Sequence, residues 1–188
     1  MTKASKLKDL EAEILAKDIC AELAASATQL VMGSGNLDAK ILFIGEAPGK
    51  TEDEQGLPFV GASGKFLDTM LEAAGMKRND VYITNIVKYR PPNNRDPSKA
   101  EIVEFWPYLL RQIQIIQPQV VITLGRFSMN CFLPDAKISQ QHGQMVEYSD
   151  NGISFRLIPL YHPAAALYNG SMRQTLIDDF VRTSELLT

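Results

Sequence analysis

Four short apolar segments, each of a length suited to a β-strand, alternate with helical patterns along this chain. They span residues 41–44, 81–85, 120–124 and 157–160. Between the first two, Phe66, Met70 and Leu71 recur at the three- and four-residue spacing of a helix. This alternation predicts an α/β fold with a parallel sheet covered by helices on both faces. Ligands of such sheets bind beyond the carboxyl ends of the strands, so residues just after each strand are the first candidates for a site.

Local signals set the expected limits of the other elements. A capping box from Ser98 to Glu101 predicts a helix that ends before Pro118, and Gly75 is placed to end the helix over residues 65–74. Further predictions are a first helix over about residues 6–25, a hairpin at residues 150–152 and a final helix over about residues 171–187. With no repeat or long linker, we expect one domain over residues 1–188.

Composition narrows the class of protein. The chain has no apolar run near the about 20 residues that span a bilayer and no signal-peptide pattern, so we expect a cytoplasmic protein without a membrane partner. Cys20 and Cys131 are the only cysteines, too few for a disulfide framework or a tetrahedral metal site. The net charge is −3, yet residues 77–99 hold six basic and two acidic residues. This basic segment fits either a phosphate-binding patch or a solvated loop.

The residues after the strands carry the chemistry. Residues 45–51 approach a phosphate-binding P-loop but are one residue short between the glycines, and Glu46 there is better suited to general-base work. Phe59 can be a core residue or a stacking platform for a planar ligand. Asn85 can be a turn residue or can read an amide-like base edge. His162, one of two histidines, is either structural or functional.

Five motifs together resemble those of the family 4 uracil-DNA glycosylases. They are Gly45-Glu46-Ala47-Pro48-Gly49, Pro58-Phe59-Val60-Gly61, Thr84-Asn85-Ile86-Val87-Lys88, Arg90-Pro91-Pro92-Asn93-Asn94-Arg95 and Tyr161-His162-Pro163-Ala164-Ala165. The resemblance covers about residues 33–173. It implies a three-layer α/β/α sandwich around a four-stranded parallel sheet, in a monomer. It also implies hydrolysis of the N-glycosidic bond of deoxyuridine in single- or double-stranded DNA, after the uracil is flipped out of the stack.

The resemblance assigns roles to individual residues. Glu46 would orient or deprotonate the attacking water, and His162 would stabilise negative charge on the departing uracil. Phe59 would stack on the uracil and Asn85 would hydrogen-bond its Watson–Crick edge. The base would also be held by backbone amides around Ala47 and Gly49. The DNA-binding candidates are Leu167 as a wedge in the duplex gap and Ser63, Lys88, Arg90, Arg126 and Arg173 as phosphate contacts.

The chain departs from the family pattern where relatives carry four cysteines that ligate an iron–sulfur cluster. The corresponding positions hold Asp18, Ala21, Tyr89 and Phe105. We therefore expect no cluster and no other cofactor, with Tyr89 and Phe105 filling the space by apolar packing. Two smaller departures are Ser34 in place of an acidic residue and His142-Gly143 in place of an Arg-Gly pair. The second predicts one weaker DNA contact.

Other functions compete with an active glycosylase. A uracil-DNA or single-strand binding module could keep the pocket and lose catalysis, but such a module needs no water-activating Glu46. A covalent uracil-DNA cross-linking class carries a nucleophilic histidine after the Arg-Pro-Pro segment, whereas residues 93–98 here contain none. A relative with broader base specificity stays open, although such relatives usually lack the carboxylate of Glu46.

Overall fold

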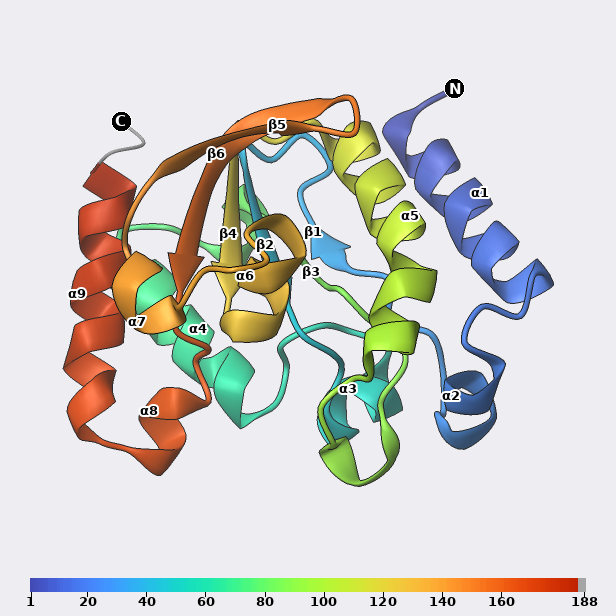
Figure 1. The fold of residues 1–188 in the computed structure, drawn as a ribbon, viewed down its shortest axis with the longest axis horizontal. Helices are drawn as coiled ribbons and strands as arrows, with labels where there is room; N and C mark the ends of the chain where they lie inside the picture. Colours follow the sequence, from blue (N-terminus) through green and yellow to red (C-terminus); the bar gives the residue numbers. More distant parts are fainter. Residues whose placement is uncertain (186–188) are drawn as a thin grey trace.

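The computed structural model describes residues 1–185 of the chain and is built on one six-stranded sheet with strand order β1-β3-β2-β4-β6-β5 (Figure 1). The four inner strands are parallel and are β2 (Ile41–Gly45), β3 (Tyr82–Asn85), β4 (Val120–Leu124) and β6 (Ile153–Leu160). The edge strands, β1 (Ser34–Gly35) and β5 (Val146–Asp150), run antiparallel to their neighbours. The predicted α/β class is confirmed, but the expected count of four strands is wrong.

The two additional strands have local causes. β5 forms because the chain reverses at Asn151 and Gly152, which have φ values of 52° and 73°, and then pairs with β6. This confirms the hairpin predicted at residues 150–152. β1 is only two residues long and pairs with β3 through Ser34 and Gly35. A segment that short carries no periodicity from which a strand could be predicted.

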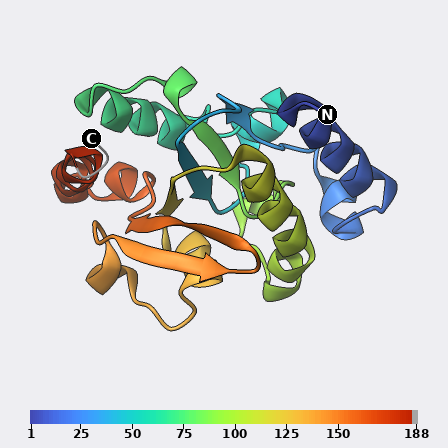
Figure 2. The same cartoon turned by 90° about the horizontal axis from the view of Figure 1, so that it is seen from above.

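Helices cover both faces of the sheet (Figure 2). They are α1 (Lys3–Ala16), α2 (Ala21–Ser26), α3 (Lys50–Gln55), α4 (Ala62–Ala73), α5 (Lys99–Ile116), α6 (Arg126–Phe132), α7 (Ile138–Gln141), α8 (Ala165–Tyr168) and α9 (Ser171–Glu185). Short 3-10 turns lie at Arg78–Asp80 and Pro92–Asn94. The helices α1, α2 and α5 contribute to one core and α4 and α9 to the other, which is the expected three-layer arrangement.

Alternation along β2 shows how one strand serves both cores. Leu42 and Ile44 pack into the core shared with α1 and α5, whereas Phe43 between them packs into the core shared with α4 and α9. All three side chains are fully buried. A strand buried on both faces reads in sequence as a continuous apolar run, and this is the pattern of residues 41–44.

Most predicted helix limits agree with the structure, and one does not. The capping box of Ser98 and Glu101 is present at the start of α5, and Gly75 adopts φ 69° after α4. The single helix expected over residues 6–25 is wrong, because Asp18 and Cys20 take left-handed backbone conformations and separate α1 from α2. The final helix begins at Ser171 as predicted, and the last two residues of its predicted range, 186 and 187, lie outside the described residues.

Within the described residues, no helix is both long and apolar enough to cross a lipid bilayer.

Candidate active site

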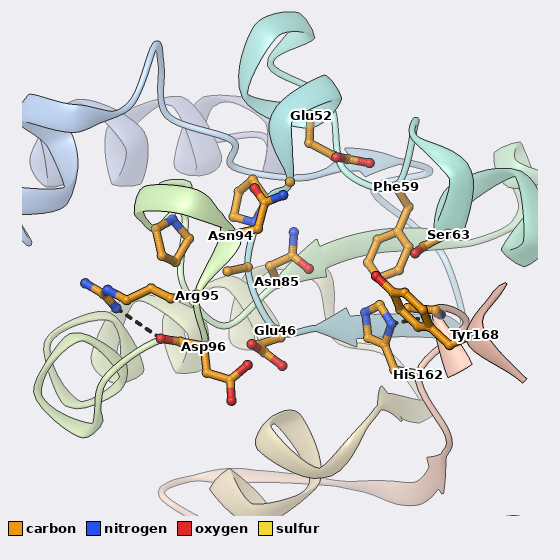
Figure 3. Close-up of a pocket in the computed structure, with 15 residues that line it drawn as sticks. Glu46, Glu52, Phe59, Ser63, Asn85, Asn94, Arg95, Asp96, His162 and Tyr168 are labelled. Carbon is orange, nitrogen blue, oxygen red and sulfur yellow. Dashed lines mark hydrogen bonds between the residues drawn. The ribbon is translucent and has the colours of Figure 1, made fainter. Parts of the chain in front are cut away.

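A cavity of about 390 Å³ opens at the carboxyl end of the parallel strands (Figure 3). Three strands contribute directly, since Glu46 follows β2, Asn85 ends β3 and His162 follows β6. Its lining consists of Glu46, Ala47, Pro48, Gly49, Glu52, Phe59, Ser63, Asn85, Pro91, Asn94, Arg95, Asp96, His162, Ala164 and Tyr168. The structure therefore brings together the residues predicted for catalysis and uracil binding, although they come from distant parts of the chain.

The Glu46 carboxyl group is partly withdrawn from water. The pKa of Glu46 is raised to about 7, mainly by burial and also by the negative charge of Asp96, while the positive charge of Arg126 opposes the shift. Arg126 also forms an exposed ion pair with Asp96, with 3.4 Å between Nη2 and Oδ2. A carboxylate with a pKa near the working pH can both exist in its basic form and accept a proton effectively, as a general base requires.

The ring of His162 is held in one tautomer by a backbone contact. Its Nδ1 atom accepts a hydrogen bond of 3.1 Å from the backbone N–H of Ala164. Burial lowers the pKa of His162 to about 4, an effect that the charge of Glu52 opposes. At neutral pH the ring is therefore uncharged, and its single proton lies on Nε2 because Nδ1 is an acceptor. Such a ring can donate a hydrogen bond to an oxygen atom on which negative charge develops.

Asn85 and Phe59 form the part of the cavity that suits a flat polar ligand. Oδ1 of Asn85 is buried and has no hydrogen-bond partner within residues 1–185. A buried acceptor without a partner is costly, so a ligand that supplies a donor there would be favoured. The Phe59 ring lies 5.7 Å from the His162 ring, at an interplanar angle of 31°. A flat, hydrogen-bonding heterocycle matches both features.

Gly45 at the end of β2 makes the proximity of Asn85 and Phe59 possible. A Cβ atom on Gly45 would lie 2.4 Å from Oδ1 of Asn85 and 2.5 Å from the Phe59 ring. Both distances are shorter than real Cβ contacts, so any side chain would displace one of the two residues. Gly45, the glycine of the first motif, therefore keeps Asn85 and Phe59 close together because it has no side chain.

One predicted DNA contact, Lys88, is wrong. Its side chain is fully buried, and Nζ lies 2.6 Å from Oγ1 of Thr84, 2.7 Å from the carbonyl oxygen of Asn85 and 2.7 Å from Oε1 of Gln112. It cannot reach a phosphate because α5 covers it. The sequence suggested a surface position because lysine is almost never fully buried without a charged partner.

The other DNA-binding candidates lie nearer the surface. Ser63 lines the cavity, and Nε of Arg90 donates a hydrogen bond of 2.7 Å to Asn94. Arg126 and Arg173 are exposed, and the Arg173 guanidinium lies 4.7 Å from the centre of the Phe66 ring. Leu167 is exposed on α8, outside the cavity lining. Their roles toward DNA stay predictions.

Two carboxylates of the cavity lining, Glu52 and Asp96, were not among the predicted site residues. The charge of Glu52 opposes the lowering of the His162 pKa, and the charge of Asp96 adds to the raising of the Glu46 pKa. Tyr168 also lines the cavity and is 90% exposed. It ends the segment Ala164–Tyr168, which the resemblance places in the duplex gap with Leu167 as the wedge.

The positions where relatives carry cluster cysteines do not fit an iron–sulfur cluster. Tyr89 and Phe105 are buried and pack edge to face, with 5.9 Å between ring centroids, so the predicted apolar packing is confirmed. Asp18 and Ala21 are exposed. The two cysteines of the chain cannot supply four ligands, and residues 1–185 contain no group of three or more side chains able to hold a metal ion.

His142, which stands where the family pattern has an arginine, contacts other residues of the protein. Nδ1 of His142 lies 2.6 Å from Oδ2 of the buried Asp179 on α9, and its ring lies 4.7 Å from that of Tyr161. Its ring is thus engaged by two internal partners. Nothing in the structure explains the effect of Ser34.

Comparison with known proteins decides the family. The model of the uracil DNA glycosylase superfamily matches residues 32–183. The chain belongs to this superfamily. The match includes all six strands of the sheet and the whole cavity lining, and it begins after α1 and α2.

Similar proteins narrow the assignment to the type-4 enzymes within the superfamily. A type-4 uracil-DNA glycosylase of Archaeoglobus fulgidus is 44% identical over 96% of this chain and 92% of its own length. One of Saccharolobus solfataricus is 46% identical over 84% of this chain and 76% of its own length. A third, from Thermotoga maritima, is 36% identical over the entire chain and 98% of its own length. The predicted resemblance to this family is confirmed.

Proposed function

We propose that this glycosylase-family chain hydrolyses the N-glycosidic bond of deoxyuridine in DNA, the first step of base excision repair. The observation that carries the proposal is the convergence of Glu46, Asn85 and His162 at the ends of three different strands in one cavity. The family membership agrees with it, since three relatives of 36–46% identity are named type-4 uracil-DNA glycosylases. A cavity of about 390 Å³ is large enough for a single base flipped out of the stack.

Recognition of uracil follows from the donors and acceptors of its edge. Oδ1 of Asn85 would accept the N3–H of uracil, and the amide Nδ2 would donate to the neighbouring carbonyl oxygen. Cytosine presents an acceptor and an amino group at these positions, so it would leave the buried Oδ1 unpaired. Phe59 would stack on the face of the base, and the amides around Ala47 and Gly49 would hold its other polar atoms.

Cleavage then requires one base and one hydrogen-bond donor. In its ionised form, Glu46 would take a proton from a water molecule as the water oxygen attacks the anomeric carbon. The bond from that carbon to N1 of uracil breaks, and its electron pair leaves with the base. The neutral His162 would donate from Nε2 to a uracil oxygen that carries the resulting negative charge. The immediate products are the uracil anion, an abasic sugar that carries the water hydroxyl, and a protonated Glu46. Free neutral uracil forms when the anion takes up a proton from solvent, and Glu46 returns its proton to solvent.

Binding to the DNA backbone would use the exposed cations around the cavity. Arg126 and Arg173 are exposed, Ser63 lines the cavity, and Arg90 donates to Asn94 of the cavity lining, so these four are the proposed phosphate contacts. Leu167, with Tyr168 beside it, would fill the gap left by the flipped base. We further propose that a monomer of one domain over residues 1–188 acts in the cytoplasm on single- or double-stranded DNA, and that it does so without an iron–sulfur cluster.

Excision assays test the proposal directly. Purified protein is incubated with oligonucleotides that contain one uracil, either single-stranded or paired with guanine or adenine, and abasic sites are then cleaved with alkali. We expect cleavage of uracil strands only. Glu46→Ala and His162→Ala should each lower the rate by about 100-fold or more while circular dichroism stays unchanged. Unchanged rates in both variants would refute the mechanism, and retarded uracil-DNA without any product would identify a binding module.

A further inference from the structure

The stacking residue Phe59 has an unusual backbone conformation. Its φ angle is 52°, in the left-handed region that residues with a side chain rarely adopt, and its side chain is buried in the cavity wall. A residue held in such a conformation depends on the groups around its backbone. The side chains that bind the peptide units on either side of Phe59 therefore decide whether this conformation is kept.

Glu52 on α3 fixes the peptide units that follow Phe59. Its Oε1 atom accepts hydrogen bonds from the backbone N–H of Val60 at 2.9 Å and from that of Gly61 at 2.7 Å. Space for the carboxylate comes from two glycines, because a Cβ atom would lie 2.9 Å from Oε2 at Gly49 and 3.1 Å from Oε1 at Gly61. One carboxylate thus joins the loop after β2 to the loop that carries Phe59.

Arg78 fixes the same loop from the other side. Its guanidinium donates to the carbonyl oxygen of Phe59 and, at 3.3 Å, to that of Pro58. Asp68 on α4 orients it, with 2.5 Å between Nε of Arg78 and Oδ1 of Asp68. Gly64 leaves room for this arrangement, since a Cβ there would collide with the Phe59 carbonyl group. The carbonyl of Phe59 and the two amides after it are therefore all bound to charged side chains.

We propose that Glu52 is a positioning residue of the uracil site, which acts with Arg78 to hold Phe59 in its left-handed conformation and so aims its ring at the base. This inference rests on the proposed function. Glu52 lines the cavity itself, yet its charge is partly offset by the two N–H groups that it accepts from. A carboxylate used in this way does not need to touch the substrate.

A purely structural role is the competing explanation, because Gly61 is also the N-cap of α4. The two roles differ in how Glu52 and Phe59 couple. If Glu52 acts through the ring of Phe59, removing the carboxylate should matter little once that ring is gone. If Glu52 only stabilises α4, the two substitutions should have independent effects that multiply.

The test is a double-mutant cycle on single-turnover excision of uracil from single-stranded DNA. Glu52→Ala and Phe59→Ala should each lower kcat/KM by about tenfold or more, and the double variant should be within about twofold of Phe59→Ala. Glu54→Ala is the matched control, since Glu54 is an exposed carboxylate on the same helix, and its rate should equal that of the wild type. Affinity for uracil-free DNA should stay unchanged in every variant.

Two conservative variants keep the test decisive if Glu52→Ala does not fold. Glu52→Gln retains a carbonyl oxygen that can accept from both amides and should recover most of the rate. Glu52→Asp is one methylene shorter and should remain slow. Multiplying effects in the cycle, or a Glu52→Ala rate equal to that of Glu54→Ala, would overturn the positioning role alone. A wild-type protein that excises no uracil would overturn the proposed function and this inference together.

Discussion

Charge at single residues controls the chemistry of this cavity. Glu46 has its pKa raised to about 7, mainly by burial and further by Asp96, whereas burial lowers the pKa of His162 to about 4. The carboxyl group therefore changes its charge near neutral pH, while the imidazole stays neutral there. This separation fits the proposed roles of Glu46 as the base and of His162 as the hydrogen-bond donor.

The pH dependence of excision should report the ionisation of Glu46. Its pKa lies above the ordinary value, so the basic form is lost as the pH falls through about 7, and the rate should fall about tenfold per unit below that. Single-turnover rates between pH 5 and pH 9 measure this, with Glu46→Gln as the control for other titrations. A wild-type rate that stays constant from pH 5 to pH 7 would exclude Glu46 as the base.

At the scale of elements, the end of β3 is bound by the buried side chain of Lys88. Lys88 joins Thr84 and Asn85 of this region to Gln112 of α5 through three hydrogen bonds of 2.6–2.7 Å. Gln112 in turn donates to the carbonyl oxygen of Met32 at 2.9 Å, ahead of β1. Lys88 thus binds the backbone carbonyl of Asn85, the residue that we propose reads the uracil edge.

The free energy of unfolding should depend on pH because Lys88 is buried in the folded state. Burial lowers the pKa of this residue to about 7 in the folded state, against an ordinary value of 10.5. Between these values the unfolded chain binds more protons than the folded one, so stability from this group rises with pH across the window. The free energy of unfolding by urea, measured at pH 7 and pH 10, should increase more for the wild type than for Lys88→Met. Equal changes in both proteins would show that the lysine does not titrate differently on folding.

At the scale of the whole molecule, side-chain packing fills the positions where the family pattern implies cluster cysteines. The Tyr89 and Phe105 rings pack together, and the backbone N–H of Cys20 donates to Glu104 on α5 at 2.8 Å. Arg95 forms a two-pronged ion pair with Glu101 at 2.6 and 2.9 Å beside the Arg-Pro-Pro segment. These contacts connect the N-terminal helices, α5 and the rim of the cavity.

Removal of metal should therefore leave the protein unaffected. Metal analysis of purified protein should find no stoichiometric iron, and incubation with a chelator should change neither the excision rate nor the melting temperature. The physical reason is that two cysteines, only one of them near these positions, cannot provide the four ligands of a cluster. About four iron atoms per chain, or loss of the fold on chelation, would contradict this expectation.

The sequence by itself determined the class of fold and the identity of the main site residues. Parallel strands buried on both faces appear as continuous apolar runs, so the four inner strands could be recognised, and the residues after them met at one edge as such sheets require. The lack of four cysteine ligands for a cluster could also be seen in the sequence, because it requires only a count of residues. Local signals also placed the start of α5 and the turn before β6.

Tertiary structure alone decided the features that depend on residues distant in sequence. Lys88 looked like a surface cation, yet α5 buries it and supplies one of its acceptors. Glu52 had no predicted role, yet it binds the amides of Val60 and Gly61, which lie eight and nine residues further along the chain. Burial and hydrogen bonding arise from the packing of segments against each other, whereas periodicity and motif spacing report only on neighbours along the chain. For that reason the sequence identified the residues that we propose carry the chemistry, and the structure showed what holds them in place.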